Sequence, residues 1–188
     1  MRLLQPENIS GRRPLVVYMH RYPPEYENQQ FCGMAALNRA ILEKYDLLYV
    51  SMAWPRPPDP ELRRGMALLE LPMAIDPTSG RDKLLKTALY YCLFPRVLRE
   101  LRRLNPDVIM CKEPLPRIPI RTARLGKPVL LAAVSDHWYA ILLGVNSLGR
   151  KLARLLERRE VLKWRETNLM IIVDTQAEKN IMVGQGAK

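Results

Sequence analysis

Short apolar runs alternate along this chain with longer segments of helical periodicity. Six runs have the length of buried strands, namely residues 14–20, 47–52, 67–71, 107–111, 128–134 and 169–173. They are apolar at successive positions rather than at every second one, which is typical of parallel strands covered on both faces. The pattern therefore predicts a mainly parallel sheet.

The segments between these runs predict helices or proline-rich loops. Helical patterns cover residues 31–45, 81–104, 118–125, 147–166 and 176–183. Pro95 predicts a kink or a split in the second of them, and Gly126 suits the end of the third. Pro23 and Pro24 predict a loop over 21–30, and four prolines predict a stiff surface connection over 54–60.

Strands that alternate with helices define the fold class. We expect an α/β, Rossmann-like, doubly wound domain, with helices on both faces of a mainly parallel sheet. A polar lead, residues 1–13, precedes a single domain over residues 14–188.

Composition indicates what kind of protein this is and in which compartment it lies. With 188 residues, 48% of them hydrophobic, the chain can bury a core, and no run reaches the roughly 20 apolar residues of a membrane span. Cys32, Cys92 and Cys111 are odd in number and far apart, which argues against a disulfide framework and a zinc site. The first residues lack the apolar core of a secretory signal, so we expect a cytoplasmic protein.

The charge balance points to anionic partners. Lys and Arg total 30 against 19 acidic residues, a net charge of +11, which favours nucleic acid, an anionic membrane surface or phosphorylated substrates. The basic helical segment 147–166 suits an anionic lipid surface. An ordinary covering helix, with leucines on the sheet and arginines in water, is the more economical interpretation of that segment.

Candidate binding residues follow the predicted strands, because ligands of open α/β sheets bind beyond the carboxyl ends of the strands. Two sets could bind an anionic or hydroxyl-rich acceptor, although solvated loops would look the same. They are Arg21, Tyr22 and Glu25 after the first strand, and Lys112, Glu113 and Arg117 after the fourth.

Two further residues, His137 and Gly33, each have a chemical and a structural interpretation. His137 could donate a hydrogen bond to a sugar oxygen while Asp136 fixes or charges its ring, or it could be an ordinary loop histidine. Gly33 could let a phosphate approach the amides that open a helix, or it could be a simple turn glycine. We interpret His20, the other histidine, as structural.

Four segments in order resemble the N-terminal half of a GT-B glycosyltransferase of the family-four type. They are VVYMHRYPPEYENQQFCGMAALNRAILEKYDLLYV, LNPDVIMCKEP, LGKPVLLAAVSDHWY and LERREVLKWRETNLMIIVDTQAEKNIMVGQGAK, together spanning about residues 14–186. The sequence departs from the family in Cys32-Gly33, where a double glycine is common, and in Asp136-His137, where the histidine often comes first.

The resemblance implies a function for the chain. It implies the acceptor-binding domain of a retaining, metal-independent glycosyltransferase, nearly inactive without a C-terminal domain that would hold the nucleotide-sugar donor. His137 would line the cleft near the transferred sugar, as a catalytic residue. The donor would be a substrate, with no separate cofactor. The partners would be a sugar or lipid-linked acceptor, the second domain or a partner subunit, and an anionic membrane surface where the protein binds peripherally. The lack of an Asp-x-Asp triplet agrees with metal independence.

Two other functions fit less well. A basic nucleic-acid-binding module is the main alternative, but the sequence has no zinc spacing, no helix-turn-helix signature and no aromatics interleaved with basic residues in a strand. A dinucleotide-dependent dehydrogenase would need Gly-x-Gly-x-x-Gly after the first strand, where only Gly33 is present.

Overall fold

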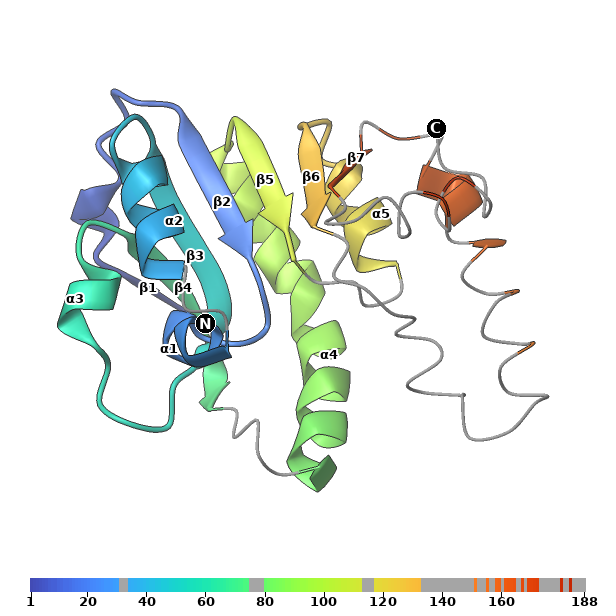
Figure 1. Cartoon of the computed structure of the whole chain (residues 1–188), viewed down its shortest axis with the longest axis horizontal. Helices are drawn as coiled ribbons and strands as arrows, with labels where there is room; N and C mark the ends of the chain where they lie inside the picture. The colour runs from blue at the N-terminus through green and yellow to red at the C-terminus, as the bar shows by residue number, and fades with distance from the viewer. Residues whose placement is uncertain are drawn as a thin grey trace. The chain divides into compact units, whose positions relative to one another are not determined.

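The computed structural model describes most of the first 132 residues and short pieces of the rest. The described residues are 1–30, 34–74, 80–112, 117–132, 151, 155, 158–159, 161–164, 167, 169–172, 180 and 183. They contain seven strands in the order β1-β4-β3-β2-β5-β6-β7, and Figure 1 shows them with their helices.

The strands and helices follow the predicted alternation. The strands are β1 (Arg2–Leu4), β2 (Leu15–Met19), β3 (Asp46–Ala53), β4 (Ala67–Ala74), β5 (Val108–Cys111), β6 (Val129–Ala132) and β7 (Leu169–Ile172). The helices are η1 (Pro6–Asn8), α1 (Pro24–Gln30), α2 (Met34–Leu42), α3 (Pro60–Arg63), α4 (Gly80–Leu104) and α5 (Ile118–Ala123). All six predicted strands are confirmed. The helices predicted at 147–166 and 176–183 lie largely outside the described residues.

Strand pairing agrees with the predicted fold class. β2 pairs with β3, β3 with β4, and β6 with β7, all in parallel, whereas β1 pairs with β4 antiparallel. From β4 to β7 the order is that of a doubly wound sheet. The chain is therefore a Rossmann-like α/β protein with a mainly parallel sheet.

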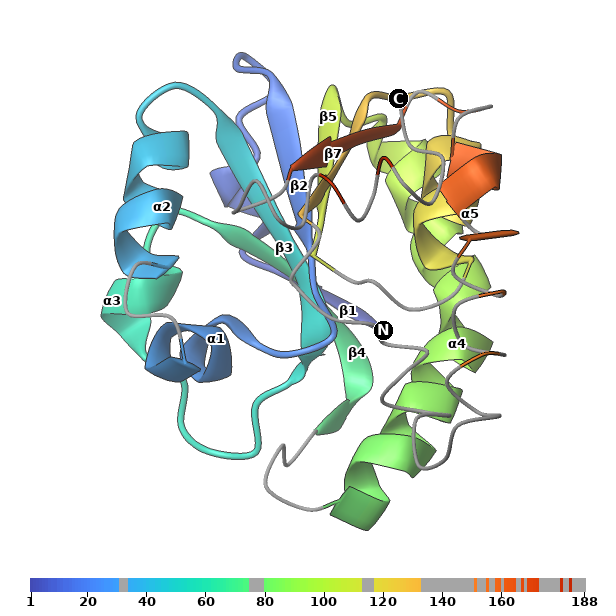
Figure 2. The same ribbon diagram turned by 45° about the vertical axis from the view of Figure 1, so that its right-hand side comes forward.

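The chain divides into two compact units, Met1–Ile109 and Met110–Lys188, and each is described by itself. In the first unit, α2 and α4 lie on opposite faces of the strands (Figure 2). All five residues of β2 are buried, and so are the first seven residues of β3. Burial on both faces explains why these runs are apolar at successive positions.

The core of the first unit is completed by α4. Tyr90, Phe94, Val97 and Leu101 have no exposed surface and recur at helical spacing. The helix runs without a break through Pro95, so the predicted split is wrong. Pro95 itself is exposed, which leaves the buried stripe intact.

Two predictions about prolines are wrong. α1 begins at Pro24, where the sequence predicts a loop, and α3 begins at Pro60, where it predicts a connection. Proline is tolerated at these positions because the N–H groups in the first turn of a helix have no hydrogen-bond partner within the helix. The lead contributes β1, and Asp46 Oδ2 at the start of β3 accepts bonds from the Ser10 amide at 2.6 Å and the Ser10 hydroxyl at 2.8 Å.

The second unit holds α5, β6 and β7 among its described residues. Val129 and Leu131 of β6 are buried, and Gly126 has a φ of +75°, as expected for a glycine that follows a helix. β7 differs from the prediction of strands covered on both faces. Met170 is 63% exposed and Ile172 43% exposed, in alternation with half-buried neighbours.

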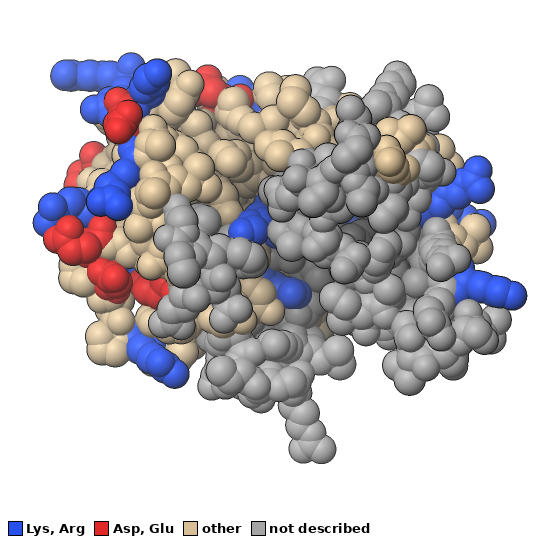
Figure 3. All heavy atoms as spheres, viewed as in Figure 1, with Lys and Arg blue, Asp and Glu red and all other residues tan. Residues whose placement is uncertain are grey.

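On the surface of the first unit, acidic and basic side chains are intermixed. Figure 3 shows them gathered at the edge where α2 and α3 lie. This face of the unit therefore has charges of both signs rather than a uniform basic patch.

Candidate functional site

The carboxyl ends of β2 and β3 lie at the same edge of the first unit. The two strands pair in parallel, with Tyr18 opposite Tyr49 and Met19 opposite Val50. His20–Tyr22 therefore follow β2 where Trp54 follows β3. This edge is where open α/β sheets bind ligands.

Two predicted site residues, Arg21 and Tyr22, contact each other at this edge. The Arg21 guanidinium carbon lies 4.8 Å from the centroid of the Tyr22 ring, a cation–π contact. The Tyr22 ring also meets the His20 and Tyr26 rings, with centroids 5.1 and 4.8 Å apart.

The backbone of this segment is fastened to β3. The Arg21 carbonyl accepts from the Met52 amide at 3.1 Å, and the Tyr22 carbonyl accepts from the Tyr49 hydroxyl at 3.3 Å. The placement agrees with a binding role for Arg21 and Tyr22, which stays a prediction.

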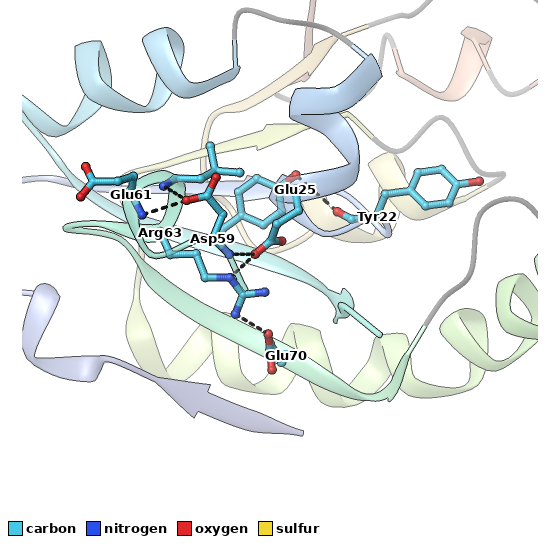
Figure 4. A network of polar contacts seen from close by, with 8 residues as sticks. Tyr22, Glu25, Asp59, Glu61, Arg63 and Glu70 are labelled. Atoms are coloured by element: carbon cyan, nitrogen blue, oxygen red, sulfur yellow. Dashed lines mark hydrogen bonds and ion pairs between the residues drawn. The ribbon is translucent and has the colours of Figure 1, made fainter. Parts of the chain in front are cut away.

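A buried ion network fixes α1 to α3 beside this edge (Figure 4). Arg63 Nε donates to Glu25 Oε1 at 2.5 Å, and Arg63 Nη1 donates to Glu70 Oε1 at 2.9 Å. Burial by itself would lower the pKa of Arg63, but the hydrogen bonds and charges of Glu25 and Glu70 together raise it. The guanidinium therefore stays positively charged at every pH at which the protein is folded.

A second group of contacts shapes the start of α3. Asp59 Oδ1 caps the helix by accepting from the amides of Glu61 at 3.0 Å and Leu62 at 3.2 Å. The Asp59 amide donates to Glu25 Oε1 at 3.3 Å. Glu25 Oε1 thus accepts from both the Asp59 amide and Arg63 Nε.

These elements line an open pocket of about 380 Å³ in the first unit. Its lining residues come from α1, from the connection after β3 and from α3, and they are Glu25, Asn28, Trp54, Arg56, Pro57, Asp59 and Leu62. The Arg56 guanidinium carbon lies 5.7 Å from the centroid of the Trp54 ring. The pocket combines an aromatic ring and a guanidinium with two carboxylates and an amide.

One oxygen of Glu25 is buried without a hydrogen-bond partner in the described part of the chain. The residue is 6% exposed, and its Oε2 is buried without a hydrogen-bond partner among the described residues. A buried acceptor without a partner costs about 1–3 kcal/mol. Because this oxygen has almost no accessible surface, a molecule in the pocket does not reach it.

Two of the other predicted site residues lie in the described part of the second unit. Lys112 is half-buried after β5, and Arg117 precedes α5 with a φ of 63°. Gly33, Glu113, Asp136 and His137 lie outside the described residues, so their roles stay predictions.

The sequence analysis missed most of the pocket. Trp54, Arg56 and Asp59 fall in the segment expected to be only a connection, and Arg63 was not singled out. The strand-end rule would have found the first three had it been applied after β3 as it was after β2.

None of the helices in the described part of the chain combines the length and the hydrophobicity that a bilayer span requires. No group of three or more His, Cys, Asp or Glu side chains within the same residues could hold a metal ion.

Comparison with known proteins identifies the fold. No family model and no curated protein matches the sequence. A Listeria monocytogenes protein assigned as a UDP-N-acetylglucosamine 2-epimerase matches 94% of this chain over 42% of its own length, with a TM-score of 0.52 and 12% identity. Glycyrrhiza uralensis UGT73P12, crystallised with glycyrrhetinic acid 3-O-monoglucuronide, matches 94% of this chain over 48% of its length, with the same score and identity.

The comparisons define a class by fold. Both structures are GT-B enzymes, and the chain is similar to one domain of that fold. It spans less than half the length of either structure. At 12% identity the likeness extends to the fold and not to the reaction.

Proposed function

We propose that this chain is the acceptor-binding, N-terminal domain of a nucleotide-sugar-dependent glycosyltransferase of the family-four type. The observation that carries the proposal is a GT-B-like sheet with a polar, Trp-containing pocket at the carboxyl ends of β2 and β3. The donor would be held mainly by a second domain, and the reaction would be retaining and metal-independent. The net charge of +11 suits an acceptor at an anionic membrane surface on the cytoplasmic side.

Within this proposal the remaining site residues keep the roles that the sequence suggested. Arg21, Tyr22, Lys112, Glu113 and Asp136 would contact the acceptor or line the cleft. His137 would donate to the sugar at the reacting centre, and Gly33 would lie near a phosphate of the donor.

A second candidate, nucleotide-sugar epimerisation, is favoured by the likeness to the Listeria protein. The two reactions differ in one requirement. Transfer consumes an acceptor and releases a nucleotide, whereas epimerisation needs no acceptor and leaves the nucleotide attached to the sugar.

The test compares the chain alone with the chain joined to a donor-binding GT-B domain. Both are incubated with UDP- and GDP-sugars, and NMR follows nucleotide release and the configuration of the sugar. We expect nucleotide release only from the joined protein, because a chain that forms only the acceptor side of the cleft does not hold the donor. Complete enzymes typically turn over at about 1–1,000 per second. Turnover in that range by the chain alone would refute the half-enzyme proposal, and an inverted sugar carbon without nucleotide release would favour the epimerase.

A further inference from the structure

Two stripes of residues run along opposite sides of α4. The buried stripe consists of Tyr90, Phe94, Val97 and Leu101 and belongs to the core. The second, which we call the outer stripe, repeats at the same intervals of three and four residues and is exposed throughout. It consists of Leu89, Cys92, Arg96, Arg99 and Arg103. Such intervals place side chains on one face of a helix, so the outer stripe is a continuous strip about 21 Å long at about 1.5 Å per residue.

The C-terminal part of the outer stripe is basic. Arg96, Arg99 and Arg103 are exposed there, and so is Arg102 beside them. Arg103 Nε lies 2.9 Å from a carboxylate oxygen of Glu100. In the described part of the chain, no ion pair involves Arg96 or Arg99. Two guanidinium groups therefore face solvent without a carboxylate partner among the described residues.

The stability of the helix does not explain Arg96 and Arg99. Basic residues in the last turn of a helix offset its dipole, and α4 has Arg102 and Arg103 there. This effect falls off within the last turn, and Arg96 and Arg99 precede that turn. Because the two side chains neither pack in the core nor offset the dipole, they are available to an external anion.

The two sides of the first unit differ in charge. Acidic and basic side chains are intermixed at the edge where α2 and α3 lie (Figure 3). α4 lies on the opposite face of the strands from α2 (Figure 2). Among the α4 side chains that the structure describes, every fully exposed charged one is an arginine. Attraction to an anionic surface therefore favours contact through α4.

The apolar end of the outer stripe favours a lipid surface over nucleic acid. Leu89 is 37% exposed, and Cys92 and Pro95 near it are exposed as well. A nucleic-acid backbone would bind the arginines through its phosphates and leave these apolar side chains in water. A membrane surface offers headgroup phosphates to arginine and the boundary of the acyl chains to apolar groups.

We propose that the outer stripe of α4 docks on the surface of an anionic phospholipid membrane. The guanidinium groups of Arg96 and Arg99 bind headgroup phosphates, and Leu89 contacts the boundary of the acyl chains. α4 follows β4, so the apolar end of the stripe is the end nearer to the carboxyl end of that strand. Docking brings a lipid-linked acceptor to this edge of the sheet; that consequence rests on the proposed function, whereas the docking itself does not.

The test is co-sedimentation of the full chain with vesicles of phosphatidylcholine, alone or with about one-third phosphatidylglycerol. We expect binding to the anionic vesicles only, at about 100 mM salt, with loss of binding at about 500 mM. Each basic residue near such a surface contributes about fivefold to affinity, so Arg96→Gln combined with Arg99→Gln should weaken binding by about tenfold or more. Leu89→Ser should weaken it by about twofold to fivefold.

Matched variants separate the outer stripe from net charge. Arg39→Gln combined with Arg64→Gln removes two exposed arginines from α2 and the end of α3. Arg158→Gln combined with Arg159→Gln makes the same change in the basic segment 147–166. Each pair should weaken vesicle binding by less than about twofold, because charges more than about 10 Å from the surface are screened. Circular dichroism checks the fold of every variant.

Three results would overturn the proposal. The first is an absence of preference for anionic over neutral vesicles, and the second is an equal loss of binding in the outer-stripe pair and in either control pair. The third is displacement of the chain from anionic vesicles by an oligonucleotide at about 150 mM salt, which would assign the arginines to nucleic acid. None of these measurements needs a donor or an acceptor, so a failure here is distinct from a failure of the proposed transferase.

Discussion

At the scale of single residues, Arg63 is the side chain on which the buried ion network depends. It is 8% exposed and contacts two carboxylates, Glu25 and Glu70, from different elements. Removal of one member of a buried ion pair leaves the other charge buried without a partner. The resulting loss of stability is larger than the net contribution of the intact pair.

We therefore expect Arg63→Met to lower the free energy of unfolding by about 3 kcal/mol, measured by urea denaturation. Arg64→Met is the matched control, because Arg64 is next in sequence, 76% exposed and paired with the exposed Glu61. It should cost less than about 0.5 kcal/mol. Equal losses in the two variants would show that the network does not stabilise the unit.

Some of the site residues could be predicted from the sequence, and their partners could not. Arg21, Tyr22 and Glu25 were found because they follow an apolar strand, and the structure brings them to the expected edge. The partnership of Glu25 with Arg63, 38 residues away, depends on how α3 folds after β3. No local pattern carries that information, so the pocket could be predicted only in part.

At the scale of elements, the strands were predictable and the short helices were not. Continuous apolar runs identify buried strands such as β2 and β3 because both of their faces are covered. The helices α1 and α3 are seven and four residues long, too short for an apolar stripe, and each begins with the proline that suggested a loop. Proline at the first position of a helix marks its start as well as a turn.

The start of α3 gives a prediction at this scale. Asp59→Ala should lower the free energy of unfolding by about 1 kcal/mol, because the amides of Glu61 and Leu62 lose their cap. Asp59→Asn should change it by only a few tenths, since asparagine caps nearly as well. Thermal or urea unfolding of the pair measures the difference. A loss from Asp59→Asn as large as that from Asp59→Ala would assign the effect to charge and not to capping.

At the scale of the whole molecule, fold class followed from the alternation of strands and helices. The strand order β4-β3-β2-β5-β6-β7 could not be read from the sequence itself, because periodicity identifies strands without pairing them. The predicted fold class, in contrast, is confirmed by the likeness to two GT-B structures. The fold does not identify the substrates, since one fold hosts many reactions.

The net charge of +11 also belongs to the whole molecule, and it yields the test of the nucleic-acid alternative. Charges of both signs share the face of the first unit in Figure 3, so we expect general attraction to polyanions rather than a built nucleic-acid surface. Filter binding should therefore detect DNA and RNA oligonucleotides at low salt, with binding lost by about 150 mM salt, and polyaspartate should compete as well as an unlabelled oligonucleotide. Sub-micromolar affinity at physiological salt, resistant to polyaspartate, would instead favour a nucleic-acid-binding module, because bases and not charge alone would then be recognised.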